Sequence, residues 1–260
     1  MFNNLFGKKK PEDQGSGNVS KYAQSVMDML GCQCRHFPKG SNVEVIMSAY
    51  SEAFAKREMG GYTPLLIVAD DTMLDLVGEY GQSAEEIRGF RDKLLASEPM
   101  DAHKWFVNKL TEEKNTMQEY WKEMVGTIEK HPEDAMNSFS GIVEYRTGKS
   151  AEVILANIPT ENPWEVFAWL PFGGWNECPP NEEIMWIAKY WYEKHGAIPA
   201  VMTRDILEFS AAPVKNEKAA ADLALEQYAF CSDIVTQGVN TIGRLAGALM
   251  QSATWYFWWD

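Results

Sequence analysis

The sequence has few positive charges, few cysteines and no long hydrophobic run. Its 24 Lys and Arg residues are outnumbered by 37 Asp and Glu residues, which gives a formal net charge of -13. Because contacts with phosphate groups need clustered Lys and Arg, this balance argues against nucleic-acid binding. An acidic surface fits solubility or a basic protein partner instead.

The four cysteines do not make a disulfide scaffold in a chain of 260 residues. No apolar run approaches the roughly 20 residues of a membrane-spanning helix, so we expect no integral membrane association. At the start, Phe2, Leu5 and Phe6 precede the basic residues 8–10, whereas a secretory signal has the opposite order. The sequence therefore predicts a cytoplasmic protein with a disordered tail over residues 1–19.

The chain also lacks a recognisable catalytic or metal-binding motif. Cys32, Cys34 and His36 offer three ligands, but a zinc site usually needs four, and no second Cys or His pair follows. We therefore expect no metal there and no cofactor elsewhere. Cys178 and Cys231 lie beside turn residues, with no histidine in the same sequence blocks to act as a base. They are predicted to be buried structural thiols, with a paired redox or metal role as the alternative.

What the chain does contain is tryptophan, concentrated in two short blocks. Residues 163–179 (PWEVFAWLPFGGWNECP) and residues 255–260 (WYFWWD) hold more than half of the ten tryptophans. A core can be filled with smaller aliphatic residues, so fold stability alone rarely demands such a concentration. These blocks mark the part of the chain where a functional site is expected.

Hydrophobic periodicity divides the chain into a mainly helical region over residues 20–150 and a Trp-rich α/β domain over residues 151–260. The first region includes one apolar strand near residues 65–69. In the second region strands alternate with helices, which indicates a mixed sheet covered by helices on both faces. The predicted fold class is α/β, with α+β as the alternative.

Local signals predict where individual elements begin and end. Helices are expected to end at Gly31, at residues 60–61 and at Gly196. They are expected to begin at Ser41, which forms a capping-box pattern with Glu44, and at Asn181. Further strands are expected over residues 142–145, 153–158, 164–170, 198–202, 206–209 and 255–259, and further helices over residues 219–230 and 241–250.

Four blocks in the second region resemble a bacterial family of unknown function. They are residues 163–179, residues 189–194 (KYWYEK), residues 226–238 (EQYAFCSDIVTQG) and residues 255–260. The match covers roughly residues 153–260 and is specific, because four separated blocks agree in order. The resemblance implies an α/β or α+β domain of a bacterial protein, and it implies no activity.

Polar residues follow several of the predicted strands. In an open α/β sheet, ligands bind beyond the carboxyl ends of the strands, and if these strands are parallel neighbours their polar groups converge. Such a group could bind a cation or polar ligand or act as acid and base, whereas the simpler interpretation is that it forms turns and helix caps. The candidate binding residues are Asp70, Asp71, Trp175, Asn176, Glu177, Arg204 and Asp205.

The last six residues form a second candidate. Alternation along a strand places Trp255, Phe257 and Trp259 on one face and Tyr256, Trp258 and Asp260 on the other. Core anchoring is the simpler interpretation, and it predicts a strand that is internal to the sheet or packed on both faces. The functional alternative is an aromatic interface that includes Trp255, Trp258 and Asp260.

These observations favour a non-catalytic module that binds a protein or a ligand, such as an immunity-type or regulatory protein. The rival hypothesis is a carboxylate- or metal-dependent hydrolase that uses Asp70, Glu177 and Asp205. A shared cavity between these carboxylates would favour the hydrolase.

Overall fold

The apolar runs of this sequence assemble into one six-stranded mixed sheet. The computed structural model describes residues 18–81, 83–144 and 146–260, so the expected tail over residues 1–19 lies almost wholly outside it. The strand order is β1-β3-β2-β4-β5-β6; β2 and β4 run parallel, and the other neighbours are antiparallel. The strands are β1 (Gln33–Phe37), β2 (Thr63–Val68), β3 (Val153–Ile158), β4 (Ile198–Met202), β5 (Ile206–Ser210) and β6 (Thr254–Trp258).

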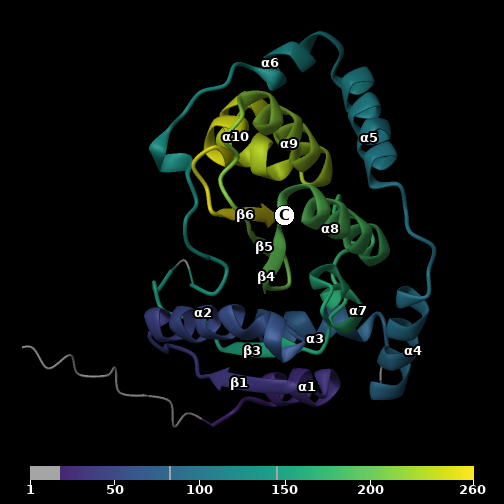
Figure 1. Cartoon of the computed structure of the whole chain (residues 1–260), viewed down its shortest axis with the longest axis vertical. Helices are drawn as coiled ribbons and strands as arrows, with labels where there is room; N and C mark the ends of the chain where they lie inside the picture. Colours follow the sequence, from purple (N-terminus) through teal and green to yellow (C-terminus); the bar gives the residue numbers. More distant parts are fainter. Residues whose placement is uncertain (1–17, 82, 145) are drawn as a thin grey trace, which may run out of the picture.

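Helices cover both faces of the sheet, as the α/β prediction expects (Figure 1). Successive side chains of a strand point to opposite faces, so each strand contributes to two cores. In β2, Leu66 and Val68 join the smaller core under α2, whereas Leu65 and Ile67 join the larger core on the other face. The α-helices are α1 (Lys21–Leu30), α2 (Val43–Gly60), α3 (Asp71–Gly78), α4 (Ala84–Leu95), α5 (Ala102–Met117), α6 (Trp121–Val125), α7 (Val166–Trp169), α8 (Asn181–His195), α9 (Glu217–Phe230) and α10 (Ile242–Leu249).

The sheet joins both parts of the chain, because β1 and β2 precede residue 151 and the other four strands follow it. The sequence does not predict strand β1. Between α4 and β3 the chain runs around the outside of the C-terminal helices (Figure 1). It is attached there at several points: Arg244 pairs with Asp134, and the Met136 carbonyl accepts hydrogen bonds from the backbone of Ala253 and Thr254.

Several local predictions are confirmed. Helix α1 begins after Ser20, whose side chain accepts a hydrogen bond from the Ala23 amide, and it ends at Gly31 in the left-handed conformation. Gly61 and Gly196 end α2 and α8 in the same way. These signals succeed because they act within one turn of the helix.

Two predicted helix caps are wrong. Asn42, not Ser41, caps α2 by accepting a hydrogen bond from the Glu44 amide at 2.8 Å, while the Ser41 hydroxyl donates to the Pro38 carbonyl. Helix α8 has Pro180 at its N-cap position. Asn181 is instead buried inside the first turn, where it accepts from the Phe172 amide and donates to the Phe167 carbonyl.

The strand predicted over residues 164–170 is wrong as well. The chain forms a short 3₁₀ turn, Pro163–Glu165, followed by α7. Val166, Phe167 and Ala168 are all buried, and a continuous apolar run cannot distinguish a buried strand from a buried helix. A strand is also predicted over residues 142–145. At this place the structure has only an isolated β-bridge between Val143 and Ser150 among the described residues, and residue 145 lies outside them.

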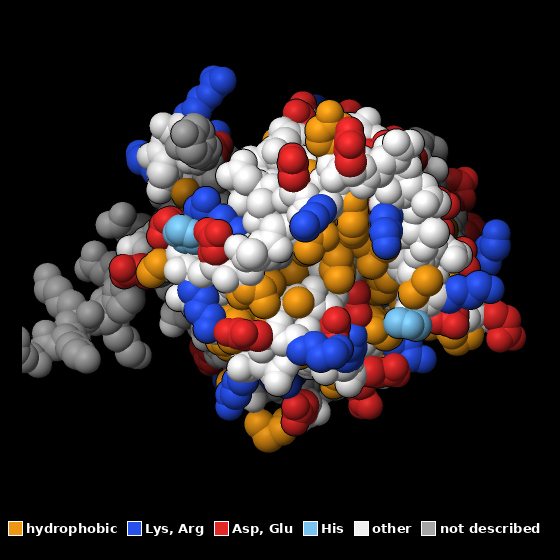
Figure 2. All heavy atoms as spheres, turned by 90° about the horizontal axis from the view of Figure 1, so that it is seen from above, with side chains coloured by type: hydrophobic (Ala, Val, Ile, Leu, Met, Phe, Trp, Pro, Cys, Tyr) orange, Lys and Arg blue, Asp and Glu red, His pale blue; other side chains and the backbone are white. Residues whose placement is uncertain are grey.

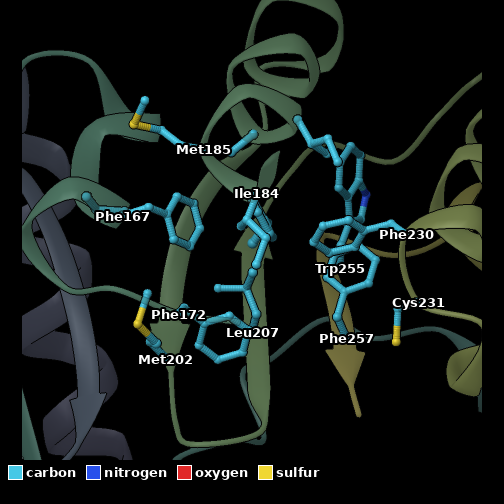
Figure 3. Close-up of a cluster of buried hydrophobic side chains, with 14 of the residues drawn as sticks. Phe167, Phe172, Ile184, Met185, Met202, Leu207, Phe230, Cys231, Trp255 and Phe257 are labelled. Carbon is cyan, nitrogen blue, oxygen red and sulfur yellow. The ribbon is translucent and has the colours of Figure 1, made fainter. Parts of the chain in front are cut away.

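Strand β6 is at the edge of the sheet, since β5 is its only strand partner among the described residues. The expected internal position is therefore wrong, but the predicted alternation is confirmed. Trp255, Phe257 and Trp259 are at most 2% exposed, whereas Tyr256 and Trp258 on the other face are half-buried. Figure 3 shows Trp255 and Phe257 beside Phe230 in the larger core.

Candidate functional site

Asp70 and Asp71 follow β2, and Arg204 and Asp205 follow β4; these two strands are parallel neighbours, because Leu66 pairs with Val201. Residues 175–177 follow α7 and not a strand, so the convergence expected for them at a strand end is wrong. Asp70 follows β2, but its carboxylate caps α3 by accepting hydrogen bonds from the Met73 amide at 2.9 Å and the Thr72 hydroxyl at 2.7 Å. Asp71 is exposed in the first turn of the same helix. The capping interpretation therefore accounts for Asp70.

Arg204 and Trp175 are in contact. The guanidinium carbon of Arg204 lies 3.9 Å from the centroid of the Trp175 ring, which is cation–π geometry. One terminal nitrogen of Arg204, Nη1, is buried and has no hydrogen-bond partner among the described residues. The loop that carries Trp175 is held from the other side, since the Tyr80 hydroxyl donates to the Gly173 carbonyl at 3.1 Å.

Asn176, Asp205 and Asp260 are linked through backbone groups. The Asn176 side-chain amide donates to the Asp260 carbonyl, and the Trp259 amide donates to the Asp205 carbonyl at 3.2 Å. The structure thus brings Trp175, Asn176, Arg204, Asp205 and Asp260 into one connected group.

Glu177 and Asn176 line a polar cavity of about 220 Å³ between α5, α8 and α9. Glu183 and Glu113 also line it, and they accept hydrogen bonds from Trp105 Nε1 and the Tyr228 hydroxyl, respectively. Asp205 is not among the described residues of this lining. Of the three carboxylates that the hydrolase hypothesis needs, this cavity therefore holds only Glu177 among its described lining residues.

An apolar cavity of about 310 Å³ lies beside β6. It is enclosed by the C-terminal half of the chain together with two residues of the connector before β3. Its lining residues are Asp134, Met136, Gln227, Asp233, Ile234, Gln237, Gly238, Val239, Leu245, Ala248, Leu249, Ser252, Thr254, Trp255, Tyr256 and Trp258.

Two buried donors at this cavity have no acceptor. Gln227 and Trp255 are each 1% exposed, and neither Gln227 Nε2 nor Trp255 Nε1 has a hydrogen-bond partner among the described residues. Buried N–H groups in proteins are almost always paired, because an unpaired one retains its full desolvation cost. Both residues line the cavity, and a ligand acceptor that reached either N–H group would remove that cost.

The carboxylates at the cavity are already engaged. Asp134 forms a bidentate pair with Arg244, whose Nη2 lies 2.8 Å from Oδ1. Asp233 accepts from Gln237 Nε2 at 3.1 Å and from the Asp260 amide at 3.3 Å. Both carboxylates are therefore held in place by partners within the protein.

One wall of the cavity is a π-helix, Ile234–Val239, which follows α9. Such wide turns are rare and occur frequently at functional sites. Here the turn places Ile234, Gln237 and Gly238 against the cavity, and it ends at Asn240 with a φ of 72°.

The Glu226 carboxylate is the centre of a buried hydrogen-bond network and does not form an open binding site. Its carboxylate accepts hydrogen bonds from the Tyr190 hydroxyl at 2.9 Å, Trp191 Nε1 at 3.1 Å and Lys194 Nζ at 2.6 Å. These contacts join α8 to α9. Its sequence neighbour Gln227 lies at the apolar cavity instead. The sequence does not distinguish the two positions, because either residue could belong to a buried hydrogen-bond network.

The thiols near the aromatic blocks are buried. Cys178 is 4% and Cys231 is 1% exposed, and both are unpaired cysteines. Burial raises the pKa of the Cys231 thiol to about 12 and raises the pKa of Cys178 well above its usual range. The Cys231 thiol donates to the Trp258 carbonyl at 3.0 Å. Both groups are thiols at neutral pH, which makes them poor nucleophiles.

The Cys32–His36 segment is divided between different contacts. The Sγ atoms of Cys32 and Cys34 lie 4.0 Å apart, while His36 Nε2 lies 2.7 Å from a carboxylate oxygen of Glu152. In the part of the chain that the structure describes, no group of three or more His, Cys, Asp or Glu side chains is arranged to hold a metal ion.

Residues 154–260 match the family model of a domain of unknown function, DUF4253. This range begins in β3 and includes β4, β5, β6, α7–α10 and most of the lining of the apolar cavity. The resemblance to an uncharacterised family is thereby confirmed for this range. No curated protein and no solved structure matches the chain. Among the described residues, no helix is both long and apolar enough to cross a membrane.

Proposed function

We propose that the chain is a non-catalytic binding module whose site is the apolar cavity beside β6. The observation that carries this proposal is the pair of unpartnered donors, Gln227 Nε2 and Trp255 Nε1, at a cavity of about 310 Å³. Small-molecule sites are typically apolar cavities of this size with a few placed polar groups. Two of the sequence blocks that mark the family, residues 226–238 and 255–260, meet there.

The lining defines the chemistry of the ligand. Leu245, Leu249 and Val239 provide apolar surface, and the half-buried rings of Tyr256 and Trp258 provide flat aromatic surface. The free polar groups are donors, so the ligand needs an acceptor such as a carbonyl oxygen. The two carboxylates at the cavity disfavour an anion. We therefore propose a small, uncharged, mainly apolar ligand with one acceptor group.

The hydrolase alternative has less support. It needs Asp70, Glu177 and Asp205 to act together, but Asp70 caps α3 and Glu177 lines a cavity whose described lining does not include Asp205. The group formed by Trp175, Asn176, Arg204 and Asp205 stays a secondary prediction, supported by the unpartnered Nη1 of Arg204. We place the module in the cytoplasm, where its net charge of -13 favours solubility.

The test uses prodan, an uncharged naphthalene with a ketone, as a fluorescent probe of the cavity. Binding should raise the melting temperature and shift the probe emission, because a ligand that binds only the folded protein stabilises it. Gln227→Leu should weaken binding by up to about tenfold, which corresponds to one hydrogen bond of about 1.4 kcal/mol.

Gln251→Leu is the matched control, since Gln251 is half-buried nearby but does not line the cavity. Trp258→Ala should weaken binding of both prodan and N-phenyl-1-naphthylamine, which has no carbonyl, whereas Gln227→Leu should affect prodan alone. Equal affinity of wild type, Gln227→Leu and Trp258→Ala for prodan would overturn the proposal.

A further inference from the structure

Two half-buried cysteines lie together far from the cavity beside β6. Cys32 is in the bend that precedes the edge strand β1, and Cys34 is the second residue of that strand. Their Sγ atoms are 4.0 Å apart, and both thiols are free. A disulfide has an S–S bond of about 2.05 Å, so the sulfurs need to approach by only about 2 Å.

The local backbone allows this approach. Cys32 follows Gly31, which has a φ of 59°, and it precedes the ladder in which Gln33 and Cys34 pair with β3. Cys34 is therefore held by the sheet, whereas Cys32 lies in the turn between α1 and β1. A small change in this turn brings one sulfur to the other without breaking the ladder.

A positive charge also acts on Cys32. Arg91 of α4 acts electrostatically on the Cys32 sulfur, and its guanidinium carbon is 3.4 Å from the centroid of the Trp169 ring. Arg91 Nε is buried and has no hydrogen-bond partner among the described residues. The guanidinium held on the ring of Trp169 therefore interacts electrostatically with the Asp92 carboxylate and also with the Cys32 sulfur.

The surroundings make the two thiols unequal. The hydrogen bond with Cys34 and the charge of Arg91 lower the pKa of Cys32, although burial opposes this. The same hydrogen bond and burial raise the pKa of Cys34. Of the two thiols, Cys32 is therefore the one whose surroundings favour the thiolate. This division resembles that between the attacking and resolving thiols of a dithiol exchange site.

We propose that Cys32 and Cys34 form a redox-active dithiol that reduces a small-molecule disulfide. The Cys32 thiolate attacks one sulfur of the substrate, forms a mixed disulfide and releases the first thiolate. Cys34 then loses its proton and attacks the Cys32 sulfur, which forms the Cys32–Cys34 disulfide and releases the second thiolate. In total, two electrons pass from the protein dithiol to the substrate, and the two protons of the dithiol balance the two product thiols.

The other two cysteines provide an internal comparison. Cys178 and Cys231 are nearly inaccessible, and burial raises the pKa of each. They should react slowly with a disulfide in the folded protein, so a reaction in native conditions reports on Cys32 and Cys34.

The experiment treats the full chain with oxidised glutathione and follows the products by intact mass and peptide mapping. Wild type should lose two hydrogens and yield the Cys32–Cys34 disulfide with no lasting adduct. Cys34→Ser should accumulate one glutathione on Cys32, because the resolving thiol is missing. Cys32→Ser should react at least about tenfold more slowly, since one pKa unit changes the thiolate fraction tenfold.

A second measurement examines Arg91 as a positioning residue. The pH profile of Cys32 alkylation by iodoacetamide, measured in the Cys34→Ser background, should move to higher pH in Arg91→Met and return towards its original position in Arg91→Lys. Circular dichroism of each variant confirms that it is folded.

Two results would overturn the proposal. In the first, oxidised glutathione produces no Cys32–Cys34 disulfide in wild type and, under the same conditions, no adduct in folded Cys34→Ser. The other is a first adduct on Cys178 or Cys231 in the folded wild type.

Discussion

The indole ring of Trp191 is stacked on the ring of Phe257, with centroids 5.5 Å apart and planes inclined by 6°. Trp191 lies on α8 and Phe257 on the edge strand β6, so this contact joins a central helix to the last strand of the sheet. Trp191 also meets Phe230 and Trp255 edge-on, and its Nε1 donates to Glu226. The aromatic blocks of the sequence are therefore mainly one continuous core.

Deletion of residues 255–260 should abolish cooperative unfolding. It removes Trp255, Phe257 and Trp259, which are at most 2% exposed, and exposes the larger core. Each of these rings contributes roughly 1.5–3 kcal/mol by burial, and a whole domain is stable by only about 5–15 kcal/mol. Thermal unfolding followed by near-ultraviolet circular dichroism checks this, and an unchanged transition would mean that the segment is mounted on the surface.

Trp258, the last residue of β6, and Trp259, which follows it, should differ in how much their replacement by alanine lowers stability. Trp259→Ala should lower the free energy of unfolding by about 3–5 kcal/mol, because the ring packs against Phe172 and Phe230 in the core. Trp258→Ala should cost much less, since this ring is half-buried at the cavity. Urea titration of both variants measures the difference, and equal losses would contradict the assignment of the two faces.

Removal of the Glu226 carboxylate should destabilise the contact between α8 and α9. Glu226→Ala leaves the buried Trp191 Nε1 without an acceptor and also frees Tyr190 and Lys194, at an expected cost of about 2–3 kcal/mol. Glu193→Ala is the control, because Glu193 is exposed and its loss should stay within about 0.5 kcal/mol. Similar midpoints of urea unfolding for the two variants would show that the network contributes little.

Glu208 should make stability depend on pH. It is fully buried on β5, and burial raises the pKa of its carboxyl group despite hydrogen bonds from the amides of Ser140 and Gly141 and the Ser140 hydroxyl. Because its pKa is higher in the folded than in the unfolded state, its stabilising contribution is complete below the unfolded pKa. This contribution is lost as the pH rises through the folded pKa.

Glu208→Gln cannot titrate, so it removes this dependence. As the pH rises from about 4 to 7, wild type should lose this contribution and the variant should not. The difference in the free energy of unfolding, variant minus wild type, should therefore increase, because any other cost of the substitution does not change with pH. Urea titrations at several pH values measure this difference. A difference that stays constant or decreases would show that the hydrogen bonds outweigh desolvation.

Gly247→Ala should displace the connector from α10. A Cβ atom at Gly247 would lie 1.7 Å from the Glu129 carbonyl oxygen, which is backbone and cannot move independently. Such overpacking typically costs about 1–3 kcal/mol. Gly89→Ala is the matched control, because it lies in α4 with no atom within 4 Å of the new Cβ, and it should raise stability by about 0.5–1 kcal/mol. Melting temperatures that change in the same direction would contradict this packing.

The sequence also indicates residues of the site, but not how they group. Trp255 and Trp258 are candidates from the sequence and Gln227 is not, and only the path of β6 beside α9 and α10 places the three at one cavity. Asp70 and Arg204 follow adjacent parallel strands, which is the condition for convergence that the sequence leaves open, but Asp70 forms its hydrogen bonds within its own helix. Whether a polar residue caps a helix or faces a ligand depends on its neighbours in space.

By itself, the sequence determined the features whose energy is local: the alternating faces of β6, the left-handed glycines that end α1, α2 and α8, and the excess of acidic charge. Only the tertiary structure decided the strand order, the edge position of β6, the helical form of residues 166–169 and the unpaired donors at the cavity. The physical reason is that periodicity and capping act over a few residues, whereas strand pairing and the burial of polar groups depend on contacts between residues far apart in the chain.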